Sequence, residues 1–414
     1  MGTVEKINLI IMCIFFVCYS YQFLYIPIVL ASGRKPPRLA APKRSVAVLI
    51  AARNEQAVIG ELIDSIRAQS YPQELIDIFV GADNCTDSTA ETARSHGAQV
   101  FQRHSRDGVG KGYVLNFILR KLAQQKRYYD AYIVVDADNI LDKDFVSAIC
   151  SCLDDGYDIA TCYRNSKNYG DNWISAGCGL WFLRESRYLN GARAVIGSSC
   201  AVSGTGFVFS RRVLEKCGGW HFFLLTEDIE FTIDNVVSGI KIGYCPNAVI
   251  YDEQPVSFRQ SWRQRTRWSR GYIQVFARYA GRLFRGIAHG SFSCYDMAMS
   301  IMPAAVLTAL SIVVNIGAAV FNLVQGGQWA ALGAAVGQTL LSLYATLFVV
   351  GAITTVTEWK SIRCSSGRKV LYAFTFPLFM LTFVPICIAA LFKDPGWQPI
   401  VHTRTLESVG NIQT

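Results

Sequence analysis

Two carboxylates stand one residue apart at the end of an apolar run. Ile133, Val134 and Val135 are β-branched and lead directly into Asp136 and Asp138, which is typical of a strand that ends on acidic side chains. Adjacent carboxylates raise each other's pKa unless a cation compensates them. Mg²⁺ is commonly held by one or two carboxylates together with substrate phosphates and water. Asp136 and Asp138 are therefore candidate metal ligands, although the pair alone is equally consistent with a cap on the following helix.

Two other apolar runs end on polar side chains in the same way. The segment Ser45–Glu55 is a continuous apolar run that closes on Arg53, Asn54 and Glu55, and Leu75–Asn84 closes on Asp83. Both are typical of buried strands of a parallel sheet.

Helical patterns stand between these strands. Apolar residues recur at spacings of three and four from residue 59 to residue 66, and an amphipathic pattern covers Gly110–Gln124. Another helix is predicted between an N-cap at Thr86 or Asp87 and a stop at Gly97. Alternating strands and helices with short connections favour a parallel sheet. Because ligands bind at the carboxyl ends of such strands, we expect Glu55, Asp83 and Asp136 to share one site.

Three later motifs carry residues suited to group transfer. They are "SGTGFVFSRR" (Ser203–Arg212), "LTEDIEF" (Leu225–Phe231) and "QRTRW" (Gln264–Trp268). A carboxylate in the second motif could take a proton from an attacking hydroxyl, and the arginine of the third could stabilise a departing diphosphate. Structural roles are the alternatives: an acidic residue at a helix N-terminus, a glycine turn, or a tryptophan at a membrane interface.

Long uncharged runs predict membrane helices. Of the 414 residues, 51% are hydrophobic, and no charged residue occurs at 7–30, 297–357 or 370–392. Since one span needs about 20 apolar residues, the first and third runs fit one helix each, and the second fits two with a turn at Gln325–Gln328. The long apolar core of the first run, and basic residues that follow it, disfavour a cleaved signal peptide.

Basic residues predict the orientation of the chain. Arg34, Lys35 and Arg38 follow the first span, and Arg363 and Arg368 precede the last. By the positive-inside rule these segments and the large domain between the first two spans are cytosolic, with the N-terminus and the tail after residue 392 outside. The net charge of +9 then favours anionic lipid over nucleic acid as the partner. Eight arginines among aromatic residues at 259–285 predict an amphipathic helix at the membrane surface. The thirteen cysteines include no C-x-x-C pair and are expected to be reduced, without a zinc site.

Taken in order, the motifs "AARNE", "ADNCTD", "GKG", "VVDADN", "SGTG", "TED" and "QRTRW" resemble those of membrane-bound family 2 glycosyltransferases. That group includes cellulose, chitin, hyaluronan and poly-N-acetylglucosamine synthases and ceramide glucosyltransferases. The resemblance covers Ser45 to about Gly271. It implies a GT-A fold, which is a Rossmann-like mixed α/β sheet, a UDP-sugar donor, a divalent cofactor (Mg²⁺ or Mn²⁺) and inversion at the anomeric carbon.

The resemblance also implies residue roles. The nucleotide would be held by Ala51, Arg53, Asn54, Glu55, Asp83 and Lys111; Asp138 would bind the metal, with Asp136 near the donor; Asp228 would be the general base beside Glu227; and Gln264, Arg267 and Trp268 would serve the diphosphate and the acceptor.

The expected organisation follows from the spans and the motifs. We expect a membrane helix and basic linker at 1–44, a GT-A domain at 45–258, interface helices at 259–294, three membrane helices at 295–392 and a tail at 393–414. The predicted function is extension of a cell-surface polysaccharide from a UDP-sugar, with single-sugar transfer to a membrane lipid as the alternative. A non-catalytic scaffold is disfavoured because several acidic residues at one strand edge need a ligand or cation. Because four spans are few for a channel, a homo-oligomer or an export partner could complete one.

Overall fold

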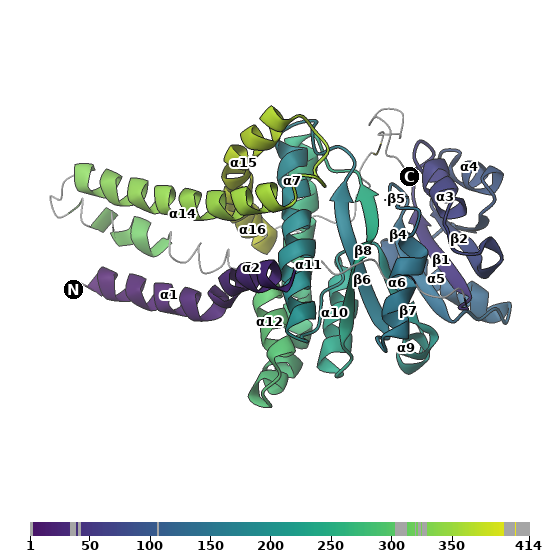
Figure 1. The fold of residues 1–414 in the computed structure, drawn as a ribbon. Helices are drawn as coiled ribbons and strands as arrows, with labels where there is room; N and C mark the ends of the chain where they lie inside the picture. The colour runs from purple at the N-terminus through teal and green to yellow at the C-terminus, as the bar shows by residue number, and fades with distance from the viewer. Residues whose placement is uncertain are drawn as a thin grey trace.

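One mixed sheet organises the chain. The structure is a computed structural model that describes residues 3–33, 39, 43–105, 107–302, 313–318, 320–321, 324, 329–392 and 402. Within these ranges eight strands pair in the order β3-β2-β1-β4-β7-β6-β8-β5 (Figure 1). The strands are β1 (Val46–Ala52), β2 (Ile76–Asp83), β3 (Gln99–Arg103), β4 (Ala131–Asp136), β5 (Ile140–Leu141), β6 (Ile159–Ser166), β7 (Phe207–Ser210) and β8 (Ile242–Asp252).

The two halves of the sheet differ in strand direction. Strands β1 to β4 are parallel, as the alternation of strands and helices predicts. Strand β7 runs antiparallel to both β4 and β6, and β5 runs antiparallel to β8. The predicted mixed α/β sheet is therefore confirmed. Strand β3 was not predicted, because "QVFQR" is short and only partly buried.

Successive side chains of each strand point to opposite faces of the sheet and contribute to a hydrophobic core on each face. Val46, Val48 and Ile50 of β1 pack with α3 (Ile59–Arg67) and α6 (Phe145–Asp154). Ala47 and Leu49 face the opposite core, which α5 (Lys111–Gln124), α10 (Glu227–Val237) and α11 (Phe258–Ala288) cover. The short helix α9 is Arg211–Lys216, and a 3₁₀ turn, η1, occupies Gln73–Leu75.

The helix predicted after Asp83 is α4 (Thr89–Ser95), and its N-cap is Ser88 rather than Thr86 or Asp87. Ser88 makes no side-chain capping hydrogen bond; the Asp87 side chain accepts from the Thr89 amide instead, at 3.1 Å, so the predicted Asp87 supplies the capping hydrogen bond from one residue before the N-cap position. The stop at Gly97 is confirmed by its positive φ of 90°.

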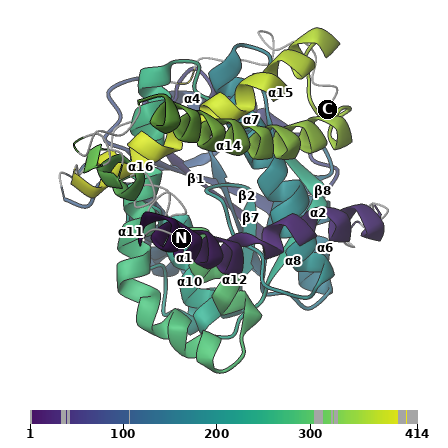
Figure 2. The same ribbon diagram turned by 90° about the vertical axis from the view of Figure 1, so that its left-hand side faces the viewer.

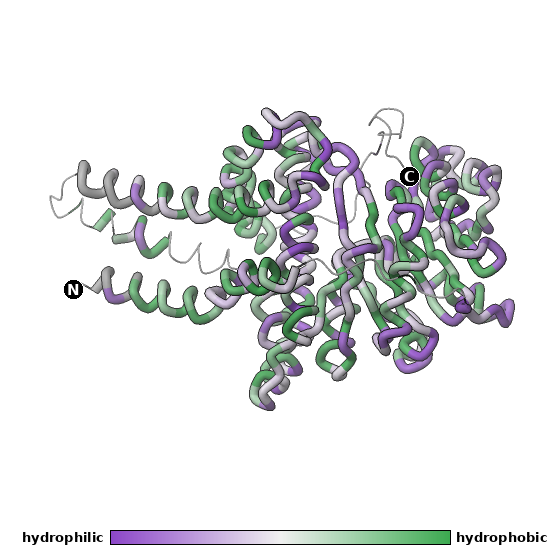
Figure 3. Tube along the Cα trace, viewed as in Figure 1, coloured by the Kyte–Doolittle hydropathy of each residue, from purple (hydrophilic) through white to green (hydrophobic). Residues whose placement is uncertain are grey.

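A layer of helices separates the sheet from the projecting helices. It contains α7 (Trp173–Arg184), the π-helical turn η2 (Glu185–Asn190), α8 (Gly191–Val195), α11 and α12 (Phe292–Ile301). Beyond it, α1 (Thr3–Tyr19) and most of α14 (Trp329–Thr357) project away from the sheet (Figure 1), and α1 is hydrophobic along most of its length (Figure 3). Figure 2 shows α1 beside α12, while α14 lies with α15 above them in this view.

Three of the described helical segments are long and apolar enough to cross a membrane: Leu9–Ser32, Leu340–Thr357 and Ser366–Phe392. The first includes α2 (Tyr21–Ser32) and the last joins α15 (Ser366–Leu381) to α16 (Phe383–Phe392). The span predicted in the first half of 297–357 and its turn at Gln325–Gln328 lie largely outside the described residues.

The last apolar segment lies against the domain. Figure 1 shows α15 and α16 beside α7 and α11, away from the projecting end of α14. The buried Arg265 guanidinium donates to the Thr382 hydroxyl at 2.7 Å and lies over the Phe379 and Phe383 rings where α15 gives way to α16. Beyond α16, His402 contacts Glu55 in the large domain. The prediction that the tail lies across the membrane from this domain is therefore wrong for residue 402.

A buried ion pair between α8 and α12 accepts two hydrogen bonds from the first apolar segment and so joins that segment to the domain. Arg193 of α8 donates to both carboxylate oxygens of Asp296 in α12, at 2.7 and 3.0 Å. The hydroxyls of Tyr21 and Tyr25 in α2 donate to the same carboxylate, at 2.7 and 2.9 Å. Because both charges are fully desolvated, removal of either partner would leave an uncompensated buried charge.

Candidate active site

A cavity lies at the carboxyl ends of the parallel strands. It collects residues from the first strand, the second strand, the α5 N-terminus, the α10 N-terminus and α11. Twelve of the thirteen residues predicted from the sequence line it: Ala51, Arg53, Glu55, Asp83, Lys111, Asp136, Asp138, Glu227, Asp228, Gln264, Arg267 and Trp268. Parallel pairing of β1, β2 and β4 brings the strand-end residues together at one edge of the sheet, and the helices α5, α10 and α11 supply the others.

Asn54 is the predicted residue that does not line the cavity. Its backbone has a positive φ of 58°, a conformation that asparagine tolerates better than most side chains. Its side-chain oxygen accepts from the Thr86 amide at 2.8 Å. Asn54 thus fastens the loop after β1 to the loop after β2, and its direct role in nucleotide binding stays a prediction.

The wall formed by β1 and β2 contains two buried carboxylates with different partners. Asp83 is ion-paired with Arg103 at the end of β3, at 2.6 Å. Burial raises the pKa of Glu55, while its contact with His402 opposes that rise. Asp83 is therefore neutralised within the sheet, whereas Glu55 faces the cavity beside a group from the tail.

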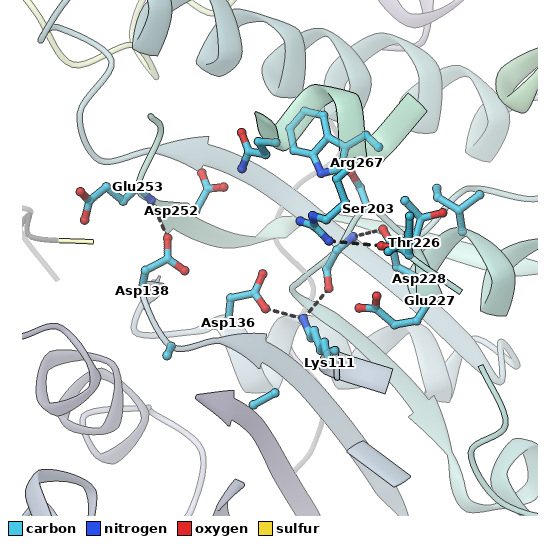
Figure 4. Close-up of a pocket in the computed structure, with 18 of the residues that line it drawn as sticks. Lys111, Asp136, Asp138, Ser203, Thr226, Glu227, Asp228, Asp252, Glu253 and Arg267 are labelled. Carbon is cyan, nitrogen blue, oxygen red and sulfur yellow. Dashed lines mark hydrogen bonds and ion pairs between the residues drawn. The ribbon is translucent and has the colours of Figure 1, made fainter. Parts of the chain in front are cut away.

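The two carboxylates at the end of β4, Asp136 and Asp138, have different partners. Lys111 Nζ contacts the Asp136 carboxylate and donates to the Gly204 carbonyl at 2.8 Å (Figure 4). Asp138 is buried, and one of its oxygens accepts from the Glu253 amide at 3.0 Å. Burial would raise the pKa of Asp138, but the positive charges of His402 and Lys167 hold it below its usual value.

Asp136 and Asp138 fit a divalent cation as a partial ligand set. No ion pair to Asp138 occurs among the residues that the structure describes, so this buried carboxylate has no cation in direct contact there. Nor does any cluster of three or more acidic, histidine or cysteine ligands occur in the described ranges. Two carboxylates completed by phosphate oxygens and water are the coordination that Mg²⁺ commonly adopts.

Opposite these groups, Asp228 sits in the first turn of α10. Its Oδ2 accepts from the Gly204 amide at 2.6 Å (Figure 4). Burial raises the pKa of Asp228, and burial together with repulsion from Asp228 raises the pKa of Glu227 to about 7. Two adjacent carboxylates, Glu227 buried and Asp228 half-buried, with raised pKa values have the proton affinity of a general base near neutral pH.

Two glycines allow the elements around this base to approach closely. A Cβ atom on Gly112 would lie 2.0 Å from the Phe222 carbonyl oxygen. A Cβ atom on Gly271 of α11 would lie 2.5 Å from the Thr226 side chain, which precedes α10. The glycine after Lys111 in "GKG" and the one that follows "QRTRWSR" therefore permit α5 and α11 to pack against the α10 N-terminus.

The α11 residues complete the opposite wall. The Arg267 guanidinium donates to the Leu225 carbonyl at 3.2 Å, and Trp268 packs edge-on against Phe182 with ring centroids 5.8 Å apart. The side-chain oxygen of Gln264 is buried and lacks a hydrogen-bond partner among the described residues. A buried acceptor of this kind is costly unless a ligand supplies the missing donor.

The structure adds residues that the motifs did not indicate. Arg164 of β6 donates to Asp252 of β8 at 2.6 Å and to the Ser203 carbonyl at 3.0 Å, and it stacks on the Phe182 ring. Trp181, Glu185, Glu253 and Tyr272 also line the cavity. The sequence signal for Arg164 and Asp252 was a charged residue within each of two apolar strand runs; Glu185 has no comparable signal.

His402 belongs to the tail that was expected across the membrane from the domain, but it lines the cavity. Its Nδ1 lies 3.0 and 3.1 Å from the two Glu55 carboxylate oxygens. Burial alone would lower the pKa of His402, but the negative charges of Asp138, Glu55 and Glu253 raise it to about 10. An imidazolium therefore occupies the part of the cavity where the nucleotide and metal were expected.

Residues 42–271 match a family model described as glycosyltransferase like family 2. A β-monoglucosyldiacylglycerol synthase of Synechocystis is 28% identical over 244 residues, which cover 58% of this chain and 50% of that protein. A poly-β-1,6-N-acetyl-D-glucosamine synthase of Staphylococcus aureus is 22% identical over 279 residues, covering 65% of each chain. The chain thus spans between half and two thirds of the length of these relatives.

A solved structure resembles nearly the whole chain. The mannosyltransferase PcManGT from Pyrobaculum calidifontis, in complex with GDP-Man and Mn²⁺, aligns with a TM-score of 0.58 and covers 94% of this chain and 99% of its own. At 17% identity this likeness shows a shared fold. The fold that is shared includes the helices outside the sheet, because the alignment extends well beyond residues 42–271.

Proposed function

Because the chain belongs to glycosyltransferase family 2, we propose that it is an inverting glycosyltransferase that moves a sugar from a UDP-sugar to an acceptor hydroxyl at the membrane face of its domain. The observation that carries this proposal is the placement of Asp228 across the cavity from Asp136 and Asp138. One side of the cavity thus offers a base, and the other offers groups suited to a diphosphate and its metal.

The base acts on the acceptor. As the acceptor hydroxyl attacks the anomeric carbon, its proton passes to Asp228, which the Gly204 amide holds in place at 2.6 Å. A diphosphate leaves without protonation, so a second acid residue is not required, in contrast with a glycosidase. Glu227 is the neighbouring carboxylate that keeps the proton affinity of the pair high.

Cations act on the leaving group. Lys111 and Arg267 line the cavity on either side of the base, where they would balance the charge that develops on the diphosphate. Asp138 and Asp136 would hold Mg²⁺ or Mn²⁺, which would supply further charge stabilisation there. Glu55, Asp83, Arg53 and Ala51 are proposed to surround the nucleotide base and ribose, with Asn54 positioning their loop.

Two classes of acceptor, a growing polysaccharide and a membrane lipid, would each offer the hydroxyl that the reaction requires. Extension of a polysaccharide remains the first expectation, and one relative is named a poly-β-1,6-N-acetyl-D-glucosamine synthase. Transfer to a membrane lipid is favoured by the relative named a β-monoglucosyldiacylglycerol synthase, which has the higher identity. We place the domain on the cytosolic side of a multi-pass membrane protein, as the basic segments indicate. A homo-oligomer or an export partner could complete a channel if the product is a polymer.

The decisive experiment measures nucleotide release by the purified chain in detergent or vesicles. UDP-sugars and GDP-mannose are each supplied with Mg²⁺ or Mn²⁺, and the products are analysed by mass spectrometry. Release of UDP from one sugar donor supports the proposal; a ladder of product lengths identifies a polymerase, and a single-sugar lipid adduct identifies a glycolipid synthase. Absence of nucleotide release from every donor would refute the enzymatic function.

A further inference from the structure

Glu185 is a cavity carboxylate that the proposed chemistry does not yet use. It is the first residue of η2, and its Oε2 accepts from the Ser203 hydroxyl at 3.1 Å. The other carboxylate oxygen, Oε1, accepts no hydrogen bond from any residue in the described part of the chain, and no ion pair to Glu185 is formed there. A carboxylate oxygen thus remains available on the cavity wall.

Glu185 is joined to the proposed base through two consecutive residues. Ser203 donates to Glu185, and the next amide, that of Gly204, donates to Asp228. The Ser203 carbonyl is in turn fixed by Arg164 at 3.0 Å. Both carboxylates therefore accept from the same two-residue segment, so a ligand that contacts Glu185 would lie within reach of Asp228.

The turn that carries Glu185 also contacts the membrane helices. Tyr188 of η2 packs with Tyr25 and Val29 of α2, and its hydroxyl lies 2.7 Å from the Thr357 hydroxyl at the end of α14. The same turn therefore has one side on the cavity and another on two projecting helices. Single π-helical turns of this kind are frequently found at functional sites.

The electrostatics of this wall indicate which acceptor it suits. Glu185 and Asp228 are both acidic. Two nearby cations are engaged by other carboxylates, Lys111 by Asp136 and Arg164 by Asp252, and the third, Arg267, is the one proposed to balance the leaving diphosphate. A phosphate group placed here would meet like charge in a desolvated site. A neutral polyol would instead donate hydroxyl protons to both carboxylates, and its apolar faces would pack on the aromatic side chains of Trp181, Phe182, Trp268 and Tyr272, which line the same region.

We propose that Glu185 binds the acceptor through Oε1 and selects a neutral, hydroxyl-rich acceptor over a lipid phosphate. One acceptor hydroxyl donates to Glu185, and this contact holds a second hydroxyl on Asp228. Glu185 therefore determines acceptor specificity, while Asp228 removes the proton. This inference rests on the proposed glycosyl transfer, and it applies equally to a sugar at the end of a polymer and to the headgroup of a glycolipid.

Acceptor-stimulated UDP release tests the proposal in the full-length protein. The probes are octyl glucoside as a lipid-anchored neutral sugar, a soluble glucose trisaccharide, and decyl phosphate as an anionic amphiphile. Wild type is compared with Glu185→Gln and with Glu215→Gln, a matched change at an exposed glutamate that pairs with Arg211. Equal UDP binding by all three proteins verifies that the donor site is folded.

We expect a neutral probe to stimulate wild type more than decyl phosphate does, and Glu185→Gln to raise the half-maximal neutral-probe concentration about tenfold, since one charge-assisted hydrogen bond is weakened. The donor KM should stay unchanged in both variants. Stronger stimulation by the trisaccharide indicates a polymer end, and stronger stimulation by octyl glucoside indicates a glycolipid.

Stimulation mainly by decyl phosphate, lack of stimulation by either neutral probe, or a Glu185→Gln protein identical to wild type would overturn the inference. If Glu185→Gln lost donor binding to the same extent as acceptor stimulation, Glu185 would have a merely structural role, and the inference would be overturned as well. These results differ from a failure of the proposed function, in which wild type releases no nucleotide from any donor.

Discussion

Replacement of Asp228 by asparagine removes the proposed base while keeping its shape. Asparagine can still accept from the Gly204 amide, which lies 2.6 Å from Asp228 Oδ2, so the α10 N-terminus should keep its position. The amide cannot take up a proton at neutral pH. Since general base catalysis contributes about 10² to 10⁴ in rate, we expect kcat to fall about 10³-fold, which corresponds to about 4 kcal/mol of activation free energy.

The assay is UDP release under saturating donor and acceptor, together with UDP binding by calorimetry. The control is Asp234→Asn on the same helix, where the carboxylate pairs with Arg282 at the surface; this variant should keep activity within about twofold. Nucleotide binding should survive in both proteins, because Lys111 and Arg267 are untouched. If Asp228→Asn retained more than about a tenth of the wild-type kcat, the assignment of the base would be refuted.

Three further outcomes are expected. Gly112→Ala should destabilise the fold by about 1–3 kcal/mol, because the added methyl would lie 2.0 Å from a backbone carbonyl oxygen. Its Tm is compared with that of Gly281→Ala, where the added methyl meets open space. Equal Tm values for the two variants would contradict the prediction. The transfer rate should fall as the pH drops below about 7, because the pKa of Glu227 is raised to about 7. Below that pH Glu227 takes up a proton, and the carboxylate pair loses its capacity as a base. A rate that stays flat from about pH 8 to 5 would exclude this pair as the base. His402→Ala should tighten UDP binding about tenfold in calorimetry, because the nucleotide no longer has to displace a charge-assisted hydrogen bond of about 1.5 kcal/mol; weaker binding would show that His402 contributes to the nucleotide site.

The strand-end residues were predictable because they follow a local rule. Asp83 and Asp136 directly follow an apolar run and Glu55 follows one within three residues, and parallel pairing of β1 with β2 and β4 brings such ends together. The later motifs could be added because the resemblance marks them in order. Asn54 shows the limit of this reasoning, because a residue inside a motif can serve the loop that carries the site rather than the cavity itself.

The remaining features depend on tertiary contacts that no short segment encodes. Glu185 lies in a π-helical turn, and neither a charge pattern nor a strand end distinguishes it in the sequence. Arg164 and Asp252 become neighbours only through the pairing of β6 with β8. The tail was misplaced because its side was counted from the spans alone: the run 370–392 has the composition of a span, but the chain beyond its two helices returns to Glu55.

The Arg193–Asp296 pair determines where this protein could be divided. Tyr21 and Tyr25 supply two of the hydrogen bonds to Asp296, and Val29 covers the side chain of Tyr188. A chain that began at Ser45 would leave a buried carboxylate short of two donors and would expose the apolar surface of η2 and α8. The catalytic domain should therefore be poorly soluble without α2, and a soluble version would require polar side chains where α2 packs on η2 and α8.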